Sequence, residues 1–258
     1  GRLETKGTLE IDEAFLAKQL DDVIPNPWIA YELGQKALQL LSKKYDKETI
    51  AANFVFIIEE LKKILESEKN KMAEQVFKKL LDRKKLCFFL IQEKGHHLLP
   101  SHIKVKSNKP LFNERTNTLI QKSLFDNVPE EDLNDTEKTV AIYLDEQEQL
   151  LWWYRNRVRK DFHIQGWQRN KIYPDFIAAK KSKSKKDDYN KVYVLETKGV
   201  HLKANDDTKY KQNVFALCNE LGAKKAWTEL FDEFPDRDFE FQVVFENEWQ
   251  NDINKIMR

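Results

Sequence analysis

Two apolar runs with strand-like character enclose a highly charged segment in the second half of the chain. Residues 171–178 read Lys-Ile-Tyr-Pro-Asp-Phe-Ile-Ala, and residues 192–199 read Val-Tyr-Val-Leu-Glu-Thr-Lys-Gly. Both runs are rich in the β-branched and aromatic residues that strands favour. The segment 180–191 between them consists mostly of Lys, Ser and Asp and cannot bury a core. The pattern therefore predicts a β-hairpin with a solvated loop.

Side-chain alternation along the second strand of this hairpin separates its polar residues into two sets, because successive side chains point to opposite faces. The first set is Val192, Val194, Glu196 and Lys198, and the second is Tyr193, Leu195 and Thr197. Glu196 and Lys198 are therefore expected on one face. If the partner strand brings Asp175 to the same edge, two carboxylates and an ammonium group lie together.

This trio has the chemistry of a nuclease. Two neighbouring carboxylates suit a hard divalent cation such as Mg²⁺, which usually keeps several waters and takes further oxygens from substrate phosphate. A cation close to Lys198 would lower the cost of its neutral form. The lysine could then orient or help to deprotonate the water that attacks a phosphodiester. Asp175, Glu196 and Lys198 are accordingly the candidate catalytic residues.

The same residues resemble a known family. Tyr173-Pro-Asp-Phe176 followed by Leu195-Glu-Thr-Lys-Gly199 looks like the PD-(D/E)XK nuclease signature. With Trp152-Trp-Tyr-Arg-Asn156 upstream and His201-Leu202 downstream, it resembles the carboxy-terminal endonuclease domain of the restriction subunit of type III restriction enzymes and related helicase-nuclease defence proteins. The resemblance covers residues 130–222 well and the rest loosely.

An architecture follows from the resemblance. It implies an α/β fold of the restriction-endonuclease type, with an αβββαβ core and a mixed sheet flanked by helices, over residues 104–258. A mainly helical connecting domain over residues 1–103 would precede it. A mixed sheet covered by helices also satisfies the burial that the hydrophobic pattern demands.

An activity also follows from the resemblance: a Mg²⁺-dependent DNA endonuclease, with Mn²⁺ expected to substitute for Mg²⁺. Asp175 and Glu196 would hold the metal, the backbone carbonyl of Thr197 would complete the shell, and Lys198 would serve the attacking water. Family members also bring a helical glutamate towards the metal, and Glu137 matches it. Glu137 can equally belong to the N-terminal cap of a helix that begins at Asn134 or Asp135, so both roles stay open.

The implied partners are DNA, an ATP-dependent helicase or translocase region in the same full-length chain, and a DNA-methylating specificity subunit. The chain has no Gly-x-x-x-x-Gly-Lys-[Ser/Thr] motif, so ATP hydrolysis is expected in another part of a longer protein. The expected role is restriction or another form of defence against foreign DNA. Two rival functions remain: a non-catalytic DNA-binding or assembly module, and a repair nuclease that acts on branched or single-stranded DNA.

An acid-x-Lys element is weak evidence in a chain where 34% of residues are charged. Leu3-Glu-Thr-Lys-Gly7 repeats the pentapeptide of residues 195–199 without a preceding Pro-Asp strand. The structural alternative is that Asp175 is a turn residue and that Glu196 and Lys198 form an exposed ion pair.

Periodicity and punctuation elsewhere predict the remaining elements. Helices are expected at Trp28–Lys44, Lys47–Glu66 and Lys71–Asp82, from Asn134, from Asp207–Thr208 to near Gly222, and at Glu248–Met257. Short strands are expected at Leu86–Ile91, Ile103–Val105, Thr118–Ile120 and Phe239–Phe245. Lys209, Lys211 and Gln212 lie near the start of the helix from Asp207, where helices of the resembling family often contact the substrate. A solvated first turn is the preferred interpretation of these three residues.

Composition narrows the function classes. A net charge of +1 excludes a histone-like binder, so DNA contacts would need local patches. Candidate patches are Arg155, Arg157, Arg159 and Lys160, flanked by Trp152, Trp153 and Trp167, and the lysines of residues 180–191. Cys87 and Cys218 lie in apolar runs and are expected to be reduced core residues of a cytoplasmic protein. No apolar run approaches the roughly 20 residues of a membrane span.

Overall fold

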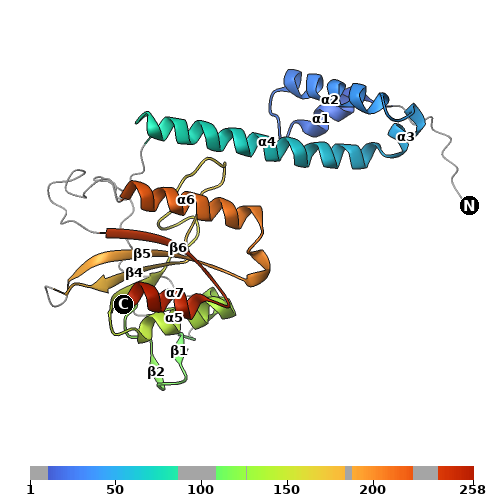
Figure 1. Cartoon of the computed structure of the whole chain (residues 1–258). Helices are drawn as coiled ribbons and strands as arrows, with labels where there is room; N and C mark the ends of the chain where they lie inside the picture. The colour runs from blue at the N-terminus through green and yellow to red at the C-terminus, as the bar shows by residue number, and fades with distance from the viewer. Residues whose placement is uncertain (1–10, 87–108, 126, 184–187, 223–237) are drawn as a thin grey trace, which may run out of the picture. The chain divides into compact units, whose positions relative to one another are not determined.

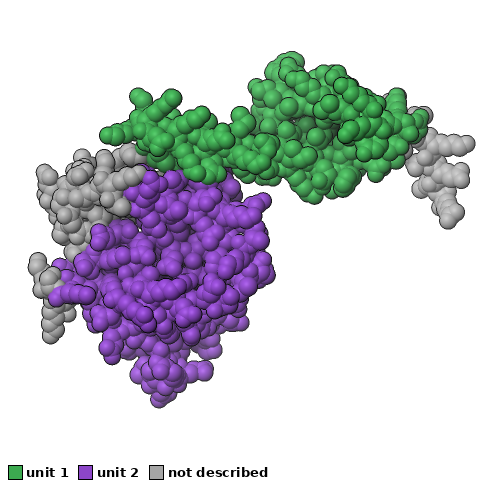
Figure 2. Space-filling view, viewed as in Figure 1, with its two compact units in different colours: residues 1–86 green, residues 87–258 purple. Residues whose placement is uncertain are grey.

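The computed structural model describes residues 11–86, 109–125, 127–183, 188–222 and 238–258. The chain forms two compact units, residues 1–86 and 87–258, coloured green and purple in Figure 2. The expected domain boundary between residues 103 and 104 falls on 87–108, outside the described residues. Cys87, the strand predicted at Ile103–Val105 and all but the first residue of the strand predicted at Leu86–Ile91 also lie outside them.

The first unit is built from helices whose bounds are α1 Glu13–Leu20, α2 Pro27–Ser42, α3 Lys47–Ala52 and α4 Phe54–Asp82. The side chains of Asp12, Asn26 and Asp46 accept backbone N–H groups at the starts of α1, α2 and α3, as helix caps do. The core of this unit contains Leu16, Leu20, Ala30, Leu38, Ile50 and Ile58.

The predicted break between a helix at Lys47–Glu66 and a helix at Lys71–Asp82 is in the wrong place. The break lies at Asn53, whose backbone is not helical (φ −106°, ψ 14°) and ends α3, and α4 then runs unbroken for 29 residues. The polar stretch 67–70 does not interrupt α4 because it lacks Pro and Gly. The polar residues of this stretch belong to a solvated face of α4 and do not indicate a helix end. Glu68 and Lys71 form an ion pair on this face.

The second unit contains a mixed four-stranded sheet in the order β3-β4-β5-β6. Its strands are β3 Leu150–Arg155, β4 Phe176–Lys181, β5 Tyr189–Lys198 and β6 Asp238–Phe245. β3, β4 and β5 pair antiparallel, whereas β5 and β6 pair parallel. The predicted hairpin is confirmed as β4–β5, but its bounds differ from the prediction. β4 begins at Phe176, directly after Asp175, and both ends of the predicted loop 180–191 pair as strand, Lys180 with Lys191 and Lys181 with Tyr189. The predicted α/β class is confirmed at this level.

Among the described residues, three helices cover the sheet: α5 Asp135–Glu146, α6 Asp206–Gly222 and α7 Trp249–Met257. Figure 1 shows α6 on one face and α5 and α7 on the other. Shorter elements complete the unit: β1 Phe112–Asn113 pairs with β2 Thr118–Leu119, and 3₁₀ turns lie at Glu130–Asp132 and Val200–Leu202. None of the helices in the described part of the chain combines the length and apolarity needed to cross a bilayer.

Alternation along β5 distributes its residues between two cores, as predicted. Tyr193 and Leu195 pack with α5 and α7, and Val192 and Val194 pack with Tyr210, Val214, Phe215 and Cys218 of α6. Cys218 is buried in this core and unbonded. The face of β5 that carries Glu196 is therefore the face that α6 covers.

A buried aspartate fastens α5 to β3. Asp145 Oδ1 accepts hydrogen bonds from Trp153 Nε1 (2.9 Å) and from the backbone N–H of Lys122 (2.7 Å). Asp145 Oδ2 accepts the backbone N–H of Gln121 (2.9 Å). Trp153 is fully buried, so core packing, not DNA contact, explains this tryptophan.

We expect Asp145→Asn to lower the free energy of unfolding by about 1.5–3 kcal/mol. The NH₂ of the new amide would face an N–H donor, and the charge-assisted hydrogen bond that the carboxylate accepts there would be lost. Urea denaturation measures the change. Asp135→Asn is the matched control on the same helix, and its fully exposed side chain predicts a change within about 0.5 kcal/mol. Equal effects of the two substitutions would contradict the structural role of Asp145.

Candidate active site

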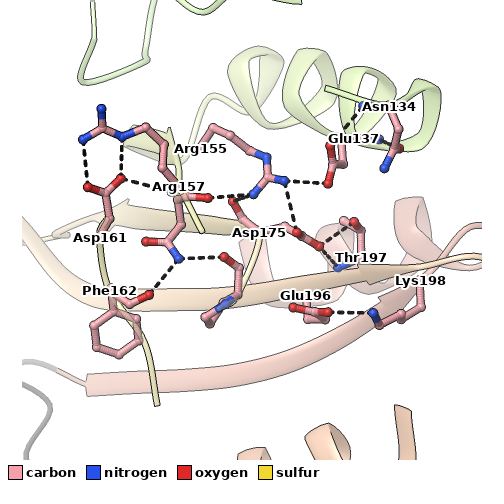
Figure 3. A network of polar contacts seen from close by, with 12 residues as sticks. Asn134, Glu137, Arg155, Arg157, Asp161, Phe162, Asp175, Glu196, Thr197 and Lys198 are labelled. Atoms are coloured by element: carbon pink, nitrogen blue, oxygen red, sulfur yellow. Dashed lines mark hydrogen bonds and ion pairs between the residues drawn. The ribbon is translucent and has the colours of Figure 1, made fainter. Parts of the chain in front are cut away.

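Asp175 is fixed by backbone and side-chain contacts at the start of β4. Its amide N–H donates to the carbonyl of Leu195 (2.9 Å), and its own carbonyl accepts the N–H of Asn156 (2.8 Å). Asp175 Oδ2 accepts both the backbone N–H and the hydroxyl of Thr197, each at 2.7 Å. Asp175 therefore joins β4 to the end of β5, which is where the sequence places the candidate site (Figure 3).

Asn156 secures the segment that leads into Asp175. Its side chain is fully buried, and its Nδ2 donates to the carbonyls of Phe162 and Pro174, both at 2.8 Å. One amide thus holds both ends of the connection between β3 and β4, so the Pro174–Asp175 bend has a defined position.

Glu196 lies at the carboxyl end of β5 with only 3% of its surface exposed. Its Oε1 is 2.9 Å from Lys198 Nζ and 2.7 Å from Lys211 Nζ. Its Oε2 is buried and has no hydrogen-bond partner. The alternative of an exposed Glu196–Lys198 ion pair is therefore wrong, since the Lys198 side chain is also only 16% exposed.

Lys211 is a site residue that the sequence reasoning missed. Its Nζ contacts Glu196 Oε1 and lies 3.4 Å from Asp207 Oδ2, one turn earlier on α6. The interpretation of a solvated turn is wrong for Lys211, whose side chain is 16% exposed, whereas the neighbouring Lys209 side chain is 59% exposed. Its spacing offered a signal: Thr208, Lys211, Phe215 and Cys218 recur at helical intervals, and the other three are buried.

Arg155 connects Glu137 to Asp175. Its Nη2 donates to Glu137 Oε1 at 2.7 Å and lies 3.3 Å from Asp175 Oδ1, as Figure 3 shows. Its Nη1 donates to the carbonyls of Asn156 and Asp175. Arg155 was predicted to belong to a surface patch that contacts DNA. That prediction is wrong, because its guanidinium points into the site and its side chain is 17% exposed.

The sequence left two roles open for Glu137, a helix cap and a metal ligand. The structure shows the first of them. Asn134 caps α5, and the two residues form a capping box: Asn134 Oδ1 accepts the N–H of Glu137, and Glu137 Oε2 accepts the N–H of Asn134. Glu137 Oε1 faces the site through Arg155. The capping role is confirmed. A direct role of Glu137 at a metal stays a prediction.

The carboxylates of this cluster have perturbed acidities. Burial raises the pKa of Glu196, and the nearby charge of Asp175 raises it further, against the opposing effect of the two lysines. Burial also raises the pKa of Glu137, with Arg155 opposing. The neighbouring carboxylates Glu196 and Asp207 raise the pKa of Lys211 despite its burial. Perturbed groups gathered at one place are typical of functional sites.

A divalent cation fits the donors that are present. A buried carboxylate oxygen without a partner, such as Glu196 Oε2, is costly unless a cation or a proton satisfies it. Asp175 adds a second oxygen anion close enough to raise the pKa of Glu196. Within the described ranges, no three His, Cys, Asp or Glu side chains group closely enough to hold a metal by themselves. Further ligands would have to be backbone oxygens, waters or substrate. Ligation by the Thr197 carbonyl stays a prediction.

Three other predicted contact residues, Arg157, Trp152 and Trp167, have partners of their own. Arg157 pairs with Asp161 through Nε (2.8 Å) and Nη2 (2.9 Å). Trp152 packs against Tyr154 and Tyr189, and Trp167 lies edge-on to Tyr210. These contacts account for both tryptophans by packing.

Comparison with known proteins adds nothing to these observations: no family model, no curated protein and no solved structure matches the chain.

We expect Lys211→Met to lower the free energy of unfolding at pH 8 by roughly 1–3 kcal/mol. The loss stays below that of a fully broken buried pair because Lys198 still contacts Glu196. Removing Lys211 raises the pKa of Glu196 further, so the difference from wild type should be smaller at pH 4.5 than at pH 8, because the charge of Glu196 that Lys211 balances is progressively lost as the pH falls.

Urea denaturation at the two pH values measures this difference. Lys209→Met is the control on the same helix and should change stability little at either pH. A loss for Lys211→Met that does not depend on pH would show that Lys211 acts by packing alone.

Proposed function

We propose that the second unit is a Mg²⁺-dependent DNA endonuclease of the PD-(D/E)XK type that hydrolyses phosphodiester bonds. The observation that carries the proposal is the state of Glu196. One oxygen of this buried carboxylate is held by two lysines, and the other has no partner. A buried carboxylate oxygen without a partner is costly unless a cation or a proton satisfies it. Glu196 also belongs to the sequence signature that predicts the metal ligands.

Each residue of the cluster takes a role in this proposal. Asp175 and Glu196 would hold the metal. When bound, Mg²⁺ supplies charge neutralisation at the scissile phosphate and favours deprotonation of water. Lys198 contacts Glu196 and would orient the attacking water. Arg155 keeps Asp175 in place, and Lys211 balances the charge of Glu196. Catalysis by positioning and electrostatics is what phosphoryl chemistry chiefly requires.

The order of elements supports the family assignment. α5, β3, β4, β5, α6 and β6 follow one another along the chain, and this is the αβββαβ order expected of the nuclease core. The resemblance to type III restriction subunits adds the wider proposal: the chain would be the nuclease part of a helicase-nuclease that acts in restriction or anti-phage defence in the cytoplasm. An ATP-dependent motor and a DNA-methylating specificity subunit would be its partners.

DNA cleavage is the direct test. Supercoiled DNA incubated with the chain in Mg²⁺ or Mn²⁺ should be nicked, and EDTA should abolish the reaction. Asp175→Asn and Lys198→Met should each lower the rate by about 10²-fold or more, because each removes a group that acts on the reacting atoms.

Exposed residues provide the controls for cleavage. Asp135→Asn and Lys63→Met make the same chemical changes at exposed side chains, and both should retain the activity of the wild type. DNA binding by the wild type without cleavage in either metal would favour the rival reading, a binding or assembly module. Preferential cleavage of branched or single-stranded DNA would favour a repair nuclease.

Metal binding gives a readout that does not require catalysis. Mn²⁺ should raise the melting temperature of the wild type, because a ligand that binds only the folded state stabilises it. The shift should be larger at pH 8 than at pH 5.5, since Glu196 has a raised pKa and must lose its proton to bind a cation. Asp175→Asn should abolish the shift and Asp135→Asn should not. An equal shift in all three proteins would place Mn²⁺ elsewhere and overturn the metal site.

A further inference from the structure

A polar pocket lies at the end of the sheet opposite to Asp175 and Glu196. It is lined by the last residues of β4, the first residues of β5 and β6, and the end of α7, and its volume is about 470 Å³. Figure 1 shows this end of the hairpin beside the end of α7. Lys191 precedes Glu196 by five residues along β5, which corresponds to about 17 Å in a strand. The pocket is therefore separate from the candidate active site.

Positive charge dominates the pocket. Its basic residues are Lys180, Lys181, Lys183, Lys191, Lys255 and Arg258, and its acidic residues are Asp238 and Glu240. Glu240 forms an ion pair with Lys191, and Lys255 Nζ lies 3.5 Å from Asp252 Oδ1. These ion pairs leave the basic residues in excess. The whole chain has a net charge of only +1, so this concentration of cations is local.

Two of the lysines are held in place by backbone carbonyls. Lys180 Nζ donates to the carbonyl of Ile256 at 3.1 Å, and Lys181 Nζ donates to the carbonyl of Glu148 at 2.7 Å. The hydroxyl of Tyr193 also donates to the carbonyl of Ile256. The Tyr193 ring lies under Lys191, with 5.2 Å between Lys191 Nζ and the ring centre. An anion would meet ammonium groups that are already positioned, which reduces the entropy lost on binding.

The cations also repel one another. Partial burial lowers the pKa of Lys180, and the charges of Lys191 and Lys183 lower it further. A multivalent anion would relieve this repulsion by contacting several ammonium groups at once.

We propose that this pocket binds closely spaced phosphate groups, either of a free oligophosphate or of a nucleic-acid backbone. Its volume is within the roughly 300–1,000 Å³ range of ligand sites. Ammonium groups bind phosphate as point charges and need no particular planar geometry, which suits lysines that come from several elements. The proposal does not depend on nuclease activity, because none of its residues belongs to the cluster around Glu196.

Binding of inorganic tripolyphosphate tests the proposal. Isothermal titration calorimetry in EDTA and low salt should detect binding to Asp175→Asn, which removes the proposed metal ligand and leaves the pocket intact. Adding Lys181→Gln and Lys183→Gln should weaken the affinity by about tenfold or more, because two charged donors are lost. Lys181→Arg with Lys183→Arg should retain the affinity.

A charge-matched control separates the pocket from general electrostatics. Lys43→Gln with Lys44→Gln removes the same charge at exposed positions of the first unit and should leave the affinity unchanged. Equal weakening by the two glutamine pairs, or no binding to the starting protein, would overturn the proposal.

Competition identifies the source of the phosphate. A short DNA duplex that displaces tripolyphosphate from the pocket would identify a nucleic-acid backbone as the ligand, and a duplex that does not displace it would identify a free oligophosphate. Cleavage of DNA is not measured in these experiments, so failure of the pocket and failure of the proposed nuclease can be told apart.

Discussion

The guanidinium of Arg155 is the contact on which the candidate site depends. It takes its position from β3, reaches Glu137 on α5 and Asp175 before β4, and donates to two backbone carbonyls in between. A planar group with several fixed donors can satisfy this many acceptors at once, which an ammonium group cannot do in the same geometry. The helix that precedes the sheet and the bend that precedes β4 are therefore held in one arrangement by one side chain.

Charge balance explains why so many ionisable groups can be buried together. Three carboxylates, of Glu137, Asp175 and Glu196, lie against the cations of Arg155, Lys198 and Lys211. Removal of Arg155 would take this ion pair from both Glu137 and Asp175, in a poorly solvated place where an unpaired charge is costly. Glu196 would keep one lysine if the other were removed. The balance is incomplete at Glu196, whose raised pKa reflects burial that the two lysines do not fully offset. Incomplete compensation of this kind is expected where a protein must still accept a ligand.

Sequence patterns located much of this arrangement because it is local. The β4–β5 hairpin, the face shared by Glu196 and Lys198, and the cap at Asn134 each follow from alternation or from a short motif, and the structure contains all three. Lys211 escaped prediction because its contact depends on how α6 is rotated against the sheet, which tertiary packing decides. Arg155 was misplaced for a similar reason, since its partner Glu137 lies 18 residues earlier. The division of α3 and α4 failed because a polar stretch in a long helix was mistaken for an end.

The burial of both faces of β5 also determines how precisely Glu196 is positioned. A shift of this strand by one residue would turn Tyr193 and Leu195 towards α6 and would carry Glu196 into the apolar layer beneath α5 and α7. Lys211, on α6, would then lie on the wrong side of the sheet. The free energy that buries Val192, Val194, Tyr193 and Leu195 therefore also selects the register in which Glu196 meets its cations. A chain with β5 in the wrong register would fail to bury these apolar side chains and would not fold stably, so a folded protein has Glu196 in its correct place.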